Sequence, residues 1–446
     1  MRSSTPAPQN PPAVSSALAP GVRPIEVWAW AMFDFANSGY TTVVITAVFS
    51  AYFVSVVAAN AAWATLAWTL SLAVSYALVM FTGPLVGAYA DVHAAKKRLL
   101  LATTAGCVLA TAALVFVGRG DLALAIVLVV ISNYCFGMGE NLIAAFLPEI
   151  ASGESMGKVS AWGWSLGYLG GLLSLGLCLV YVNWATGRGV ATEAAVPPTM
   201  LITAVLFALA SLPTFLLLKE RAQPQAGHGH AVDDTLGRLR ETLGRARRFA
   251  DLWRFLGCIV FYQAGIQAVI SLAAIYAEQA MGFSTKETLF LLLVTNITGS
   301  VGALIFGQVQ DRIGHKATLA MTLVLWIGTI LLLWWAEGVA IFWIGANLVG
   351  ICLGASQSAG RALVGYLSPE RHVGEFFGLW GLAVKLSSIV GPVTYGLVSW
   401  LSGGDHRLAI LMTGTFFIVG LALLLTINVQ RGRAAAMAYD GGDPAG

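Results

Sequence analysis

The stretch GAYADVHAAKK, from Gly87 to Lys97, has a counterpart in GQVQDRIGHK, from Gly307 to Lys316. The leading glycines of the two stretches are 220 residues apart, and so are the aspartates that follow them. Later in each half, LPE at Leu147–Glu149 is answered by SPE at Ser368–Glu370, 221 residues on. Landmarks that return in the same order at nearly one offset predict that the chain is a parallel duplication.

The sequence around these two stretches is strongly apolar. Of the 446 residues, 57% are hydrophobic and 11% are charged, whereas soluble domains carry about 25% charged residues. A helix that crosses a bilayer needs about 20 apolar residues. On that measure the sequence predicts twelve spans, at 27–57, 63–89, 99–118, 122–147, 158–182, 198–218, 252–279, 287–309, 317–336, 338–366, 374–401 and 406–428.

These spans predict an all-α polytopic membrane protein, with twelve transmembrane helices in two six-helix pseudo-symmetric bundles. One long polar segment separates the first six spans from the last six. The expected divisions are a disordered N-terminal tail at 1–22, an N-terminal bundle at 23–218, a cytoplasmic linker at 219–250, a C-terminal bundle at 251–430 and a C-terminal tail at 431–446.

The basic residues predict the orientation of the chain. If both termini are cytoplasmic, 19 of the 25 Lys and Arg lie on the cytoplasmic side, as the positive-inside rule requires. We therefore expect a multi-pass protein of a bacterial inner (plasma) membrane with both termini in the cytoplasm. The basic run Arg238–Arg248 predicts a helix against anionic lipid of the cytoplasmic leaflet, and no nucleic-acid partner is expected.

The repeated loop resembles the signature that transporters of the major facilitator superfamily carry between their second and third spans. An Asp at a helix end favours the N-terminus of a neighbouring helix, where the macrodipole attracts an anion. In that superfamily the loop is a latch between the halves, weaker in one access state than in the other. The latch residues expected here are Gly87, Asp91, Gly307, Asp311 and Arg312. Because Val92 follows Asp91 where Arg312 follows Asp311, we expect the first latch to be the weaker. A charge that only sets topology is the alternative.

Four charged residues lie within predicted spans: Asp34, Glu140, Arg361 and Lys385. A charge at the centre of a membrane helix costs about 2.5–3.5 kcal/mol on insertion scales and marks a function or a buried partner. Two acids and two bases cancel, so ion pairs that only lock helices together are the structural alternative to a binding site.

Spacing at 100° per residue places polar side chains on one face of the first, fourth, seventh and tenth spans. In the facilitator fold these four helices line the central cavity. With Lys385 from the eleventh span, the expected solute- and ion-binding residues are Asp34, Asn37, Thr41, Asn133, Glu140, Asn141, Tyr262, Gln263, Gln267, Asn347, Gln357, Arg361 and Lys385.

The fifth span is rich in small residues, in GWSLGYLGG at Gly163–Gly171. Small residues allow two helix backbones to approach closely within lipid. We therefore expect this helix to lie in the moving seam between the two halves.

Within the superfamily, the motifs resemble one family more closely. WAWAMFDFANSGYTTVV, at Trp28–Val44, looks like the YDWANSAF signature of the autophagy-linked vacuolar effluxer family. FLPEIA before GKVSAWGWSLGYLGG is similar to that family's fourth and fifth spans, and QSAGRALVGYLSPE before EFFGLWGLAVKLSSIVGP is similar to its tenth and eleventh. The match carries over Asp34, Asn37, Ser38, Gln357, Arg361, Glu375, Phe376, Phe377 and Lys385.

That resemblance implies a twelve-span secondary transporter, with amino-acid efflux from a storage compartment in the fungal members. Two places depart from the family's pattern. Ala264 stands where the family has an acidic residue, and Ile143–Ala144 stand where it has Tyr-Asn. We therefore do not transfer the family's substrate directly, and Glu140 is a candidate to compensate for the missing acid.

These features predict a secondary active transporter that moves a small zwitterionic or anionic, amino acid-like solute by alternating access. Protons are the candidate coupling ion, with Asp34 or Glu140 as the carrier, because desolvation favours the protonated form of a carboxylate. One alternative is an exporter or flippase of amphiphilic, lipid-like compounds, which the 14 Trp would suit. Another is a non-transporting membrane sensor or scaffold. We expect a monomer that contacts membrane lipid.

Other chemistries are disfavoured. All six His lie in predicted loops or at span ends, so an intramembrane hydrolase would lack a buried nucleophile–base pair. The five Cys lie in apolar segments without ligand spacing, and His228–His230 is interpreted as a solvated loop. No phosphate-binding loop follows a strand. We therefore expect no enzyme activity, no cofactor and no metal.

Overall fold

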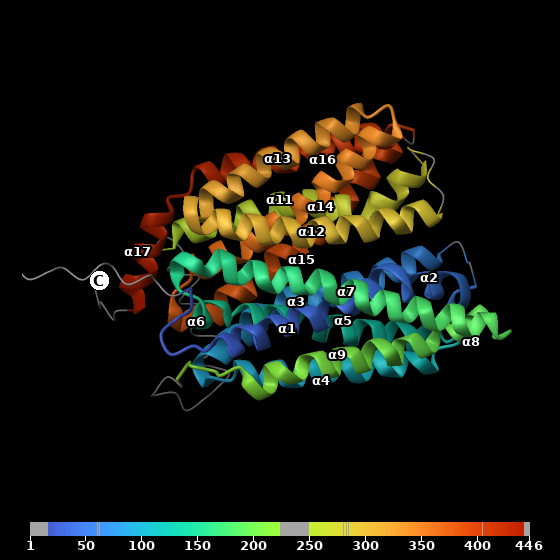
Figure 1. Cartoon of the computed structure of the whole chain (residues 1–446), viewed down its shortest axis with the longest axis horizontal. Helices are drawn as coiled ribbons and strands as arrows, with labels where there is room; N and C mark the ends of the chain where they lie inside the picture. Colours follow the sequence, from blue (N-terminus) through green and yellow to red (C-terminus); the bar gives the residue numbers. More distant parts are fainter. Residues whose placement is uncertain are drawn as a thin grey trace, which may run out of the picture.

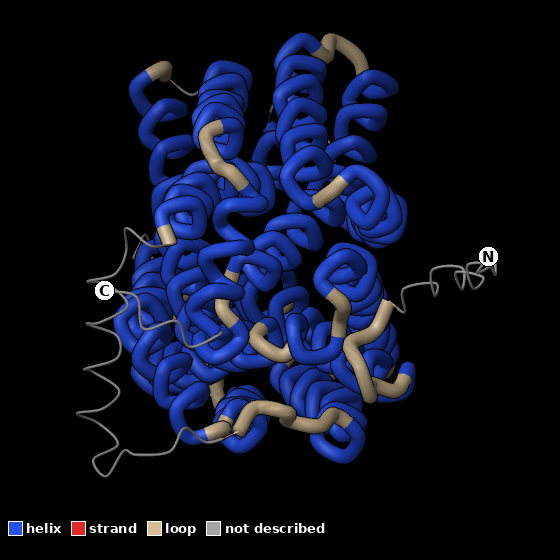
Figure 2. Tube along the Cα trace, turned by 90° about the vertical axis from the view of Figure 1, so that its left-hand side faces the viewer, coloured by secondary structure: helices blue, strands red, loops and turns tan. Residues whose placement is uncertain are grey.

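The chain folds into two groups of six long helices, which form the upper and lower halves of Figure 1. This computed structural model describes residues 17–223 and 249–440, except positions 60, 62, 280, 282, 284 and 404. Within that part of the chain, 12 helices are long and apolar enough to cross a membrane. Figure 2 shows them as helices joined by short loops. The predicted fold class is confirmed.

The N-terminal half contains the first six spans. Its elements are α1 (Pro24–Tyr40), η1 (Thr41–Ala47), α2 (Phe49–Tyr52), η2 (Phe53–Val57), α3 (Ala64–His93), α4 (Lys96–Ala113), η3 (Leu114–Phe116), α5 (Leu122–Ala144), α6 (Leu147–Ile150), η4 (Gly153–Ser155), α7 (Met156–Gly187), α8 (Thr192–Ala195) and α9 (Pro197–Leu217).

The C-terminal half contains the other six. Its elements are α11 (Ala250–Gln279), α12 (Thr285–Ile313), α13 (His315–Trp335), α14 (Val339–Leu367), η5 (Glu370–His372), α15 (Val373–Leu401), α16 (His406–Leu425) and α17 (Val429–Asp440). Predicted and observed span ends differ by a few residues, in both directions.

The two copies of the repeated stretch form two tight turns. α3 continues four residues beyond the predicted end of its span and stops at Ala94, whose φ is 46°. α12 stops before Gly314, whose φ is 88°. These residues stand 220 positions apart, so positive φ recurs at the same place in the duplication. Glycine adopts positive φ readily, whereas alanine does so at a steric cost.

The first span is not a regular α-helix. Its segment Thr41–Ala47 is π-helical, and a second π-helical turn covers Phe53–Val57. The sequence TTVVITA is rich in β-branched residues, whose restricted χ1 lowers helix propensity. Thr46 Oγ1 donates to the carbonyl of Thr41, five residues back, at 3.0 Å. Such turns are frequent at functional sites.

The halves meet where α3 lies against α15 and where α7 lies against α12 and α14. Glycines make the first contact possible, since a Cβ added to Gly374 would lie 2.7 Å from the carbonyl oxygen of Gly87. Each half also keeps an apolar core, around Trp30 in the N-terminal half and Trp326 in the C-terminal half. Lipid does not drive helices together, so close backbone approach and a few polar contacts must hold the halves.

Parts of both predicted tails make defined contacts with the rest of the chain. Residues 17–22, which the sequence assigns to the disordered tail, include Ala19, whose N–H donates to the carbonyl of Ile150 at 3.1 Å. At the other end α17 forms, and Arg431 donates to Asp251 through two nitrogens at 2.7 and 2.8 Å. The predicted lipid-binding run Arg238–Arg248 and the loop His228–His230 lie outside the described residues.

Candidate functional site

A cavity of about 620 Å³ lies between the two halves. Both halves contribute to its wall. The aromatic part of the wall comprises Tyr76, Phe136, Trp164, Tyr168, Phe290, Phe342, Trp380 and Tyr395. Of the residues expected from sequence, the cavity is lined by Asp34, Asn37, Thr41, Asn133, Glu140, Gln267, Gln357, Arg361 and Lys385.

The cavity stops short of one end of the molecule. We call that end the latch end, because Asp91 and Asp311 lie there. On the helices that line the cavity, the lining does not reach the latch residues. The lining residues nearest the latch end include Asp34, Glu140, Arg361 and Trp380. From there the wall runs outward to residues such as Ile45 and Leu179.

Asp34 and Arg361 form an ion pair between the halves. Arg361, on α14, donates from one terminal nitrogen to Asp34 Oδ2, on α1, at 2.7 Å. Its Nε donates to Ser160 Oγ at 3.0 Å, and its other terminal nitrogen donates to the Ser160 carbonyl at 2.8 Å. The guanidinium also lies over the rings of Trp30 and Trp164, at 4.8 and 5.5 Å from the ring centres. All these partners belong to the N-terminal half.

Glu140 and Lys385 form a second ion pair between the halves. Lys385 Nζ, on α15, donates to Glu140 Oε2, on α5, at 3.1 Å. The ammonium lies 5.4 Å from the ring centre of Tyr76 and 5.6 Å from that of Phe136. The four membrane charges predicted from sequence are therefore two cross-half pairs at the closed end of one cavity.

Neutral polar side chains extend this site on both sides. Gln263 Nε2 donates to Gln357 Oε1 at 2.6 Å, and Asn133 donates to Ser75 Oγ of the same half. Asn37 has a buried Oδ1 without a hydrogen-bond partner among the described residues.

Four expected residues do not line the cavity: Asn141, Tyr262, Gln263 and Asn347. Asn141 is wedged between α3 and α15, because its amide would meet Cβ atoms added at Gly83 or Gly381. Tyr262 is buried within the C-terminal half, and Gln263 reaches the site only through Gln357. Asn347 donates to the carbonyl of Trp343 in its own helix at 2.8 Å.

Sequence reasoning missed the neighbours of the charges. Ser160 precedes the small-residue stretch Gly163–Gly171, and no role is expected for it from the sequence. The rings of Trp30, Trp164, Tyr76 and Phe136 are likewise not among the expected site residues. Their spacing gives one usable signal, because Trp30 is one helical turn before Asp34, and Phe136 one turn before Glu140.

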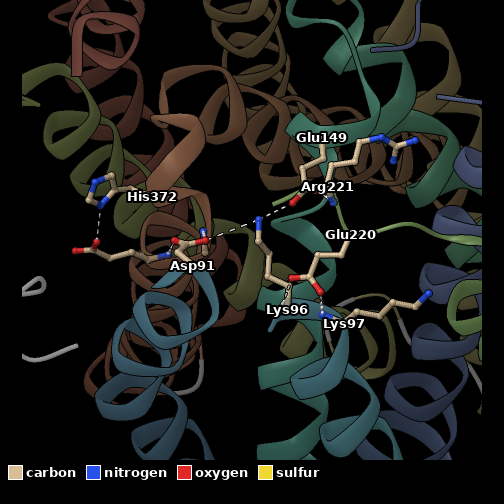
Figure 3. Close-up of polar contacts among 9 residues, drawn as sticks. Asp91, Lys96, Lys97, Glu149, Glu220, Arg221 and His372 are labelled. Atoms are coloured by element: carbon tan, nitrogen blue, oxygen red, sulfur yellow. Dashed lines mark hydrogen bonds and ion pairs between the residues drawn. The ribbon is translucent and has the colours of Figure 1, made fainter. Parts of the chain in front are cut away.

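The first latch joins the end of α3 to the start of α15. Asp91 accepts hydrogen bonds from the backbone N–H of Gly374 and of Glu375, both at 3.0 Å. The first N–H groups of a helix are free to donate to a capping carboxylate, and the helix dipole favours its negative charge there. Lys96 Nζ lies 3.8 Å from Asp91 and 2.5 Å from Glu149. Figure 3 shows Lys96 between the two carboxylates.

The second latch joins α12 to the start of α7. Asp311 accepts one hydrogen bond, from the backbone N–H of Lys158 at 3.2 Å. Arg312 is exposed. This residue was the reason to expect the second latch to be the stronger of the two. The expectation that the first latch is the weaker was wrong in terms of contacts. Lys96, five residues after Asp91, supplies the cation that Val92 does not.

The start of the linker packs against the first latch. Glu220 accepts hydrogen bonds from the backbone N–H of Lys96 at 2.7 Å and of Lys97 at 3.2 Å, so it caps α4. Arg221 donates its backbone N–H to Glu149 at 2.9 Å, as Figure 3 shows. Burial raises the pKa of the Glu220 carboxyl above its ordinary value, and the two N–H donors oppose that shift.

No group of three or more His, Cys, Asp or Glu that could hold a metal ion occurs among the described residues. The polar chemistry of the cavity is therefore two ion pairs, amides and hydroxyls. Many of the hydroxyls are already bonded to their own helix, as Thr42 is to Ser38.

Comparisons with known proteins identify the family and the fold. The family model described as vacuole effluxer Atg22 like matches residues 64–437. The MFS-type transporter YxiO of Bacillus subtilis (strain 168) is 28% identical over 401 residues, which is 89% of this chain and 93% of the relative. Autophagy-related protein 22 of Cryptococcus neoformans var. neoformans serotype D (strain B-3501A) is 22% identical over 63% of this chain and 54% of the relative. The chain thus spans about half the length of such fungal relatives.

Solved structures share the fold at low sequence identity. The human organic anion transporter MFSD10 (TETRAN) has a TM-score of 0.68 and 16% identity, over 90% of this chain and 99% of that chain. The proton:xylose symporter XylE, of the major facilitator superfamily, has a TM-score of 0.71 and 13% identity, over 90% and 95%. The family match covers most of this chain, from the second span to α17, and leaves out the first span with Asp34. This chain therefore belongs to the vacuole effluxer Atg22-like family, among the transporters of the major facilitator superfamily.

Proposed function

We propose that this protein is a secondary active transporter that moves a small zwitterionic or anionic, amino acid-like solute by alternating access. The observation that carries the proposal is the pair of cross-half ion pairs at the closed end of the cavity, Asp34–Arg361 and Glu140–Lys385. Charges are costly within a membrane, and here they face a cavity large enough for a solute.

The latches support alternating access. Each is a carboxylate at the N-terminus of a helix from the other half, a contact worth about 0.3–1 kcal/mol and up to about 2 kcal/mol when partly buried. Contacts of that size can break and reform during a transport cycle. Opening the latch end and closing the other end would then expose the same charges to the opposite side of the membrane.

The charges support a solute that carries both signs or a negative one. The two pairs are neutral together, so a zwitterion could replace one pair without leaving a buried charge unpaired. An anion would instead need a carboxylate to become neutral. That requirement makes the proton a suitable coupling ion, carried by Asp34 or Glu140.

The orientation is part of the proposal. With both termini in the cytoplasm of a bacterial cell, as the distribution of basic residues favours, the cavity opens to the outside. Efflux is the direction that the family description suggests. The protein would act as a monomer, since one chain supplies both halves of the site.

The test begins with a screen for stabilising ligands. Purified protein is heated with amino acids, peptides and organic anions, because a ligand that binds only the folded state stabilises it by about 2.7 kcal/mol at 100 times its Kd. We expect an amino acid-like hit that is also transported into proteoliposomes. Stabilisation by neutral amphiphiles alone would favour the second candidate below.

Proton coupling is tested by measuring how transport responds to a pH gradient. Transport of the hit is followed in proteoliposomes with and without a pH gradient, for the wild type, Asp34→Asn and Glu140→Gln. We expect the wild type to respond to the gradient and at least one variant to lose that response. If both variants keep the wild-type dependence, neither carboxylate carries the proton.

The apolar wall favours a second candidate function, export or flipping of amphiphilic compounds. Aromatic rings such as Trp164, Phe290 and Phe342 cover much of the cavity, and an amino acid would not fill it. Arg361 and Lys385 then require an anionic group on the amphiphile. Transport of a labelled anionic lipid analogue, without transport of amino acids, would support this candidate.

A further inference from the structure

The two ion pairs differ in burial and in the number of bonds that they make. We propose that Asp34 and Arg361, with Ser160, form a lock that holds the halves together at the closed end of the cavity. Glu140 and Lys385 are then the pair that binds the charged groups of the solute. The assignment of the solute site rests on the proposed function, whereas the lock can be tested without any solute.

Arg361 already donates three of its five N–H groups. All three guanidinium nitrogens donate to the N-terminal half, to Asp34 and to two oxygens of Ser160. Two Trp rings cover the guanidinium, and its side chain is only 4% exposed. An arginine presents its donors in a fixed fork, so a solute carboxylate would have to displace several bonds at once.

The surroundings of Arg361 also join the halves. Ser160 Oγ donates to the carbonyl of Ser358 on α14 at 3.0 Å, and Ser358 Oγ donates to the carbonyl of Gly157 on α7 at 3.4 Å. The seam between α7 and α14 thus has hydrogen bonds in both directions. Arg361, one turn after Ser358 toward the latch end, completes this seam beneath the cavity.

Glu140 and Lys385 retain free capacity. The ammonium has three donors, and the carboxylate has two oxygens, yet a single hydrogen bond of 3.1 Å joins them among the described residues. The Glu140 side chain is 25% exposed to the cavity, compared with 11% for Asp34. Its second oxygen can accept from a solute ammonium group.

A zwitterion suits this second pair. Its ammonium group would bind Glu140 and its carboxylate would bind Lys385, so each protein charge would exchange one partner for another. The rings of Tyr76 and Phe136 hold the Lys385 ammonium in place by cation–π attraction while its partner changes. The same exchange at Arg361 would dismantle the seam.

The experiment compares two matched double variants, Asp34→Asn/Arg361→Gln and Glu140→Gln/Lys385→Gln. Each removes one acid and one base, so the net charge of the protein is unchanged. Spin labels are placed at exposed Arg98 and Ala317, in opposite halves at the latch end. A second pair at exposed Val190 and Val339 reports the other end. Pulsed electron paramagnetic resonance gives the ratio of latch-open to latch-closed molecules, and protein without added cysteines gives the background.

We expect Asp34→Asn/Arg361→Gln to raise the latch-open to latch-closed ratio at least tenfold. The distance between the labels at Arg98 and Ala317 should lengthen, and that between the labels at Val190 and Val339 should shorten. Glu140→Gln/Lys385→Gln should change that ratio less than twofold but weaken binding of the stabilising solute at least tenfold. Equal effects of the two variants on the ratio, or a larger effect of the second, would overturn the proposal.

Two further results keep the test decisive. If no solute binds the wild type, the proposed function fails, while the distance ratios still decide whether the lock exists. If the Asp34→Asn/Arg361→Gln protein does not fold, Ser160→Ala replaces it. This change keeps both charges and removes the hydroxyl that accepts from Arg361 Nε and donates to the carbonyl of Ser358. It should move the ratio in the same direction by a smaller factor, and an unchanged ratio would show that Arg361 does not lock the halves.

Discussion

At the scale of single residues, Gly163 is the position that gives the first ion pair its space. A Cβ there would collide with the Asp34 carboxylate and would also meet Arg361 and the ring of Trp30. The small-residue stretch that begins at Gly163 therefore does more than bring two helices together. It lets a charged pair fit between α1, α7 and α14.

Replacement of Gly163 by Ala should therefore destabilise the protein. Overpacking a filled interior costs about 1–3 kcal/mol, and here the atoms displaced belong to an ion pair. Thermal unfolding in detergent measures the effect. Gly176→Ala is the matched control in the same helix, because nothing lies within 4 Å of a Cβ added there. That variant should gain about 0.5–1 kcal/mol, and equal losses in both variants would contradict the explanation.

The sequence predicts which residues are charged within the membrane but not how they pair. The cost of a charge in lipid identifies all four positions, yet Asp34 and Arg361 are 327 residues apart. Their pairing depends on the relative depth of two helices in different halves. Periodicity also cannot separate Asn141 from Glu140, because they lie seven and eight residues after Asn133 and both spacings belong to one helix face. In the structure only Glu140 of the two lines the cavity.

At the scale of elements, the two latches are the same kind of contact with different numbers of hydrogen bonds. Asp91 accepts two backbone N–H groups of α15, whereas Asp311 accepts one from α7. Lys96 adds a positive charge beside Asp91 only. The repeated sequence predicts both contacts and places a lysine in each copy, Lys96 and Lys316. It therefore does not predict which aspartate makes the more contacts.

Neutralising the two aspartates should reveal that order. Asp91→Asn removes the charge that faces the N-terminus of α15, and helix-terminus contacts of about 0.3–2 kcal/mol correspond to changes of about 2- to 30-fold in an equilibrium ratio. We expect Asp91→Asn to raise the ratio of latch-open to latch-closed molecules about tenfold and Asp311→Asn by about threefold or less. The same two label distances measure both variants, and a larger effect of Asp311→Asn would be evidence against this order.

The twelve membrane helices could be predicted from the sequence, but the π-helical geometry of the first span could not. Length and hydropathy locate all twelve spans, because a membrane requires them whatever their neighbours are. The π-helical segment Thr41–Ala47 depends on how threonine hydroxyls bond to nearby carbonyls and on contacts with α7. That information is not contained in the apolar pattern.

At the scale of the whole molecule, the cavity is accessible from one end only. Its lining residues extend from the ion pairs to positions such as Thr46, while glycine contacts and latches occupy the other end. The duplication predicts two halves with a site between them. It does not predict which end is closed, since both states of such a transporter share one sequence.

Labelling from outside intact bacterial cells tests this arrangement and the proposed orientation together. A membrane-impermeant thiol reagent should react with Thr46→Cys, which is exposed and lines the cavity. Arg98→Cys, exposed at the latch end, should stay unlabelled until the cells are opened. Reaction of Arg98→Cys alone would place the latch end outside and reverse the orientation.

The closed latch end has a consequence for affinity measured from each side of the membrane. A solute that arrives at the latch end can bind only those molecules in which the latches and the lock have opened. If that fraction is about 1%, its apparent Kd is about a hundredfold weaker than that of the site itself. Substitutions at Asp91 or Arg361 would then strengthen apparent binding from that side without adding any contact to the solute.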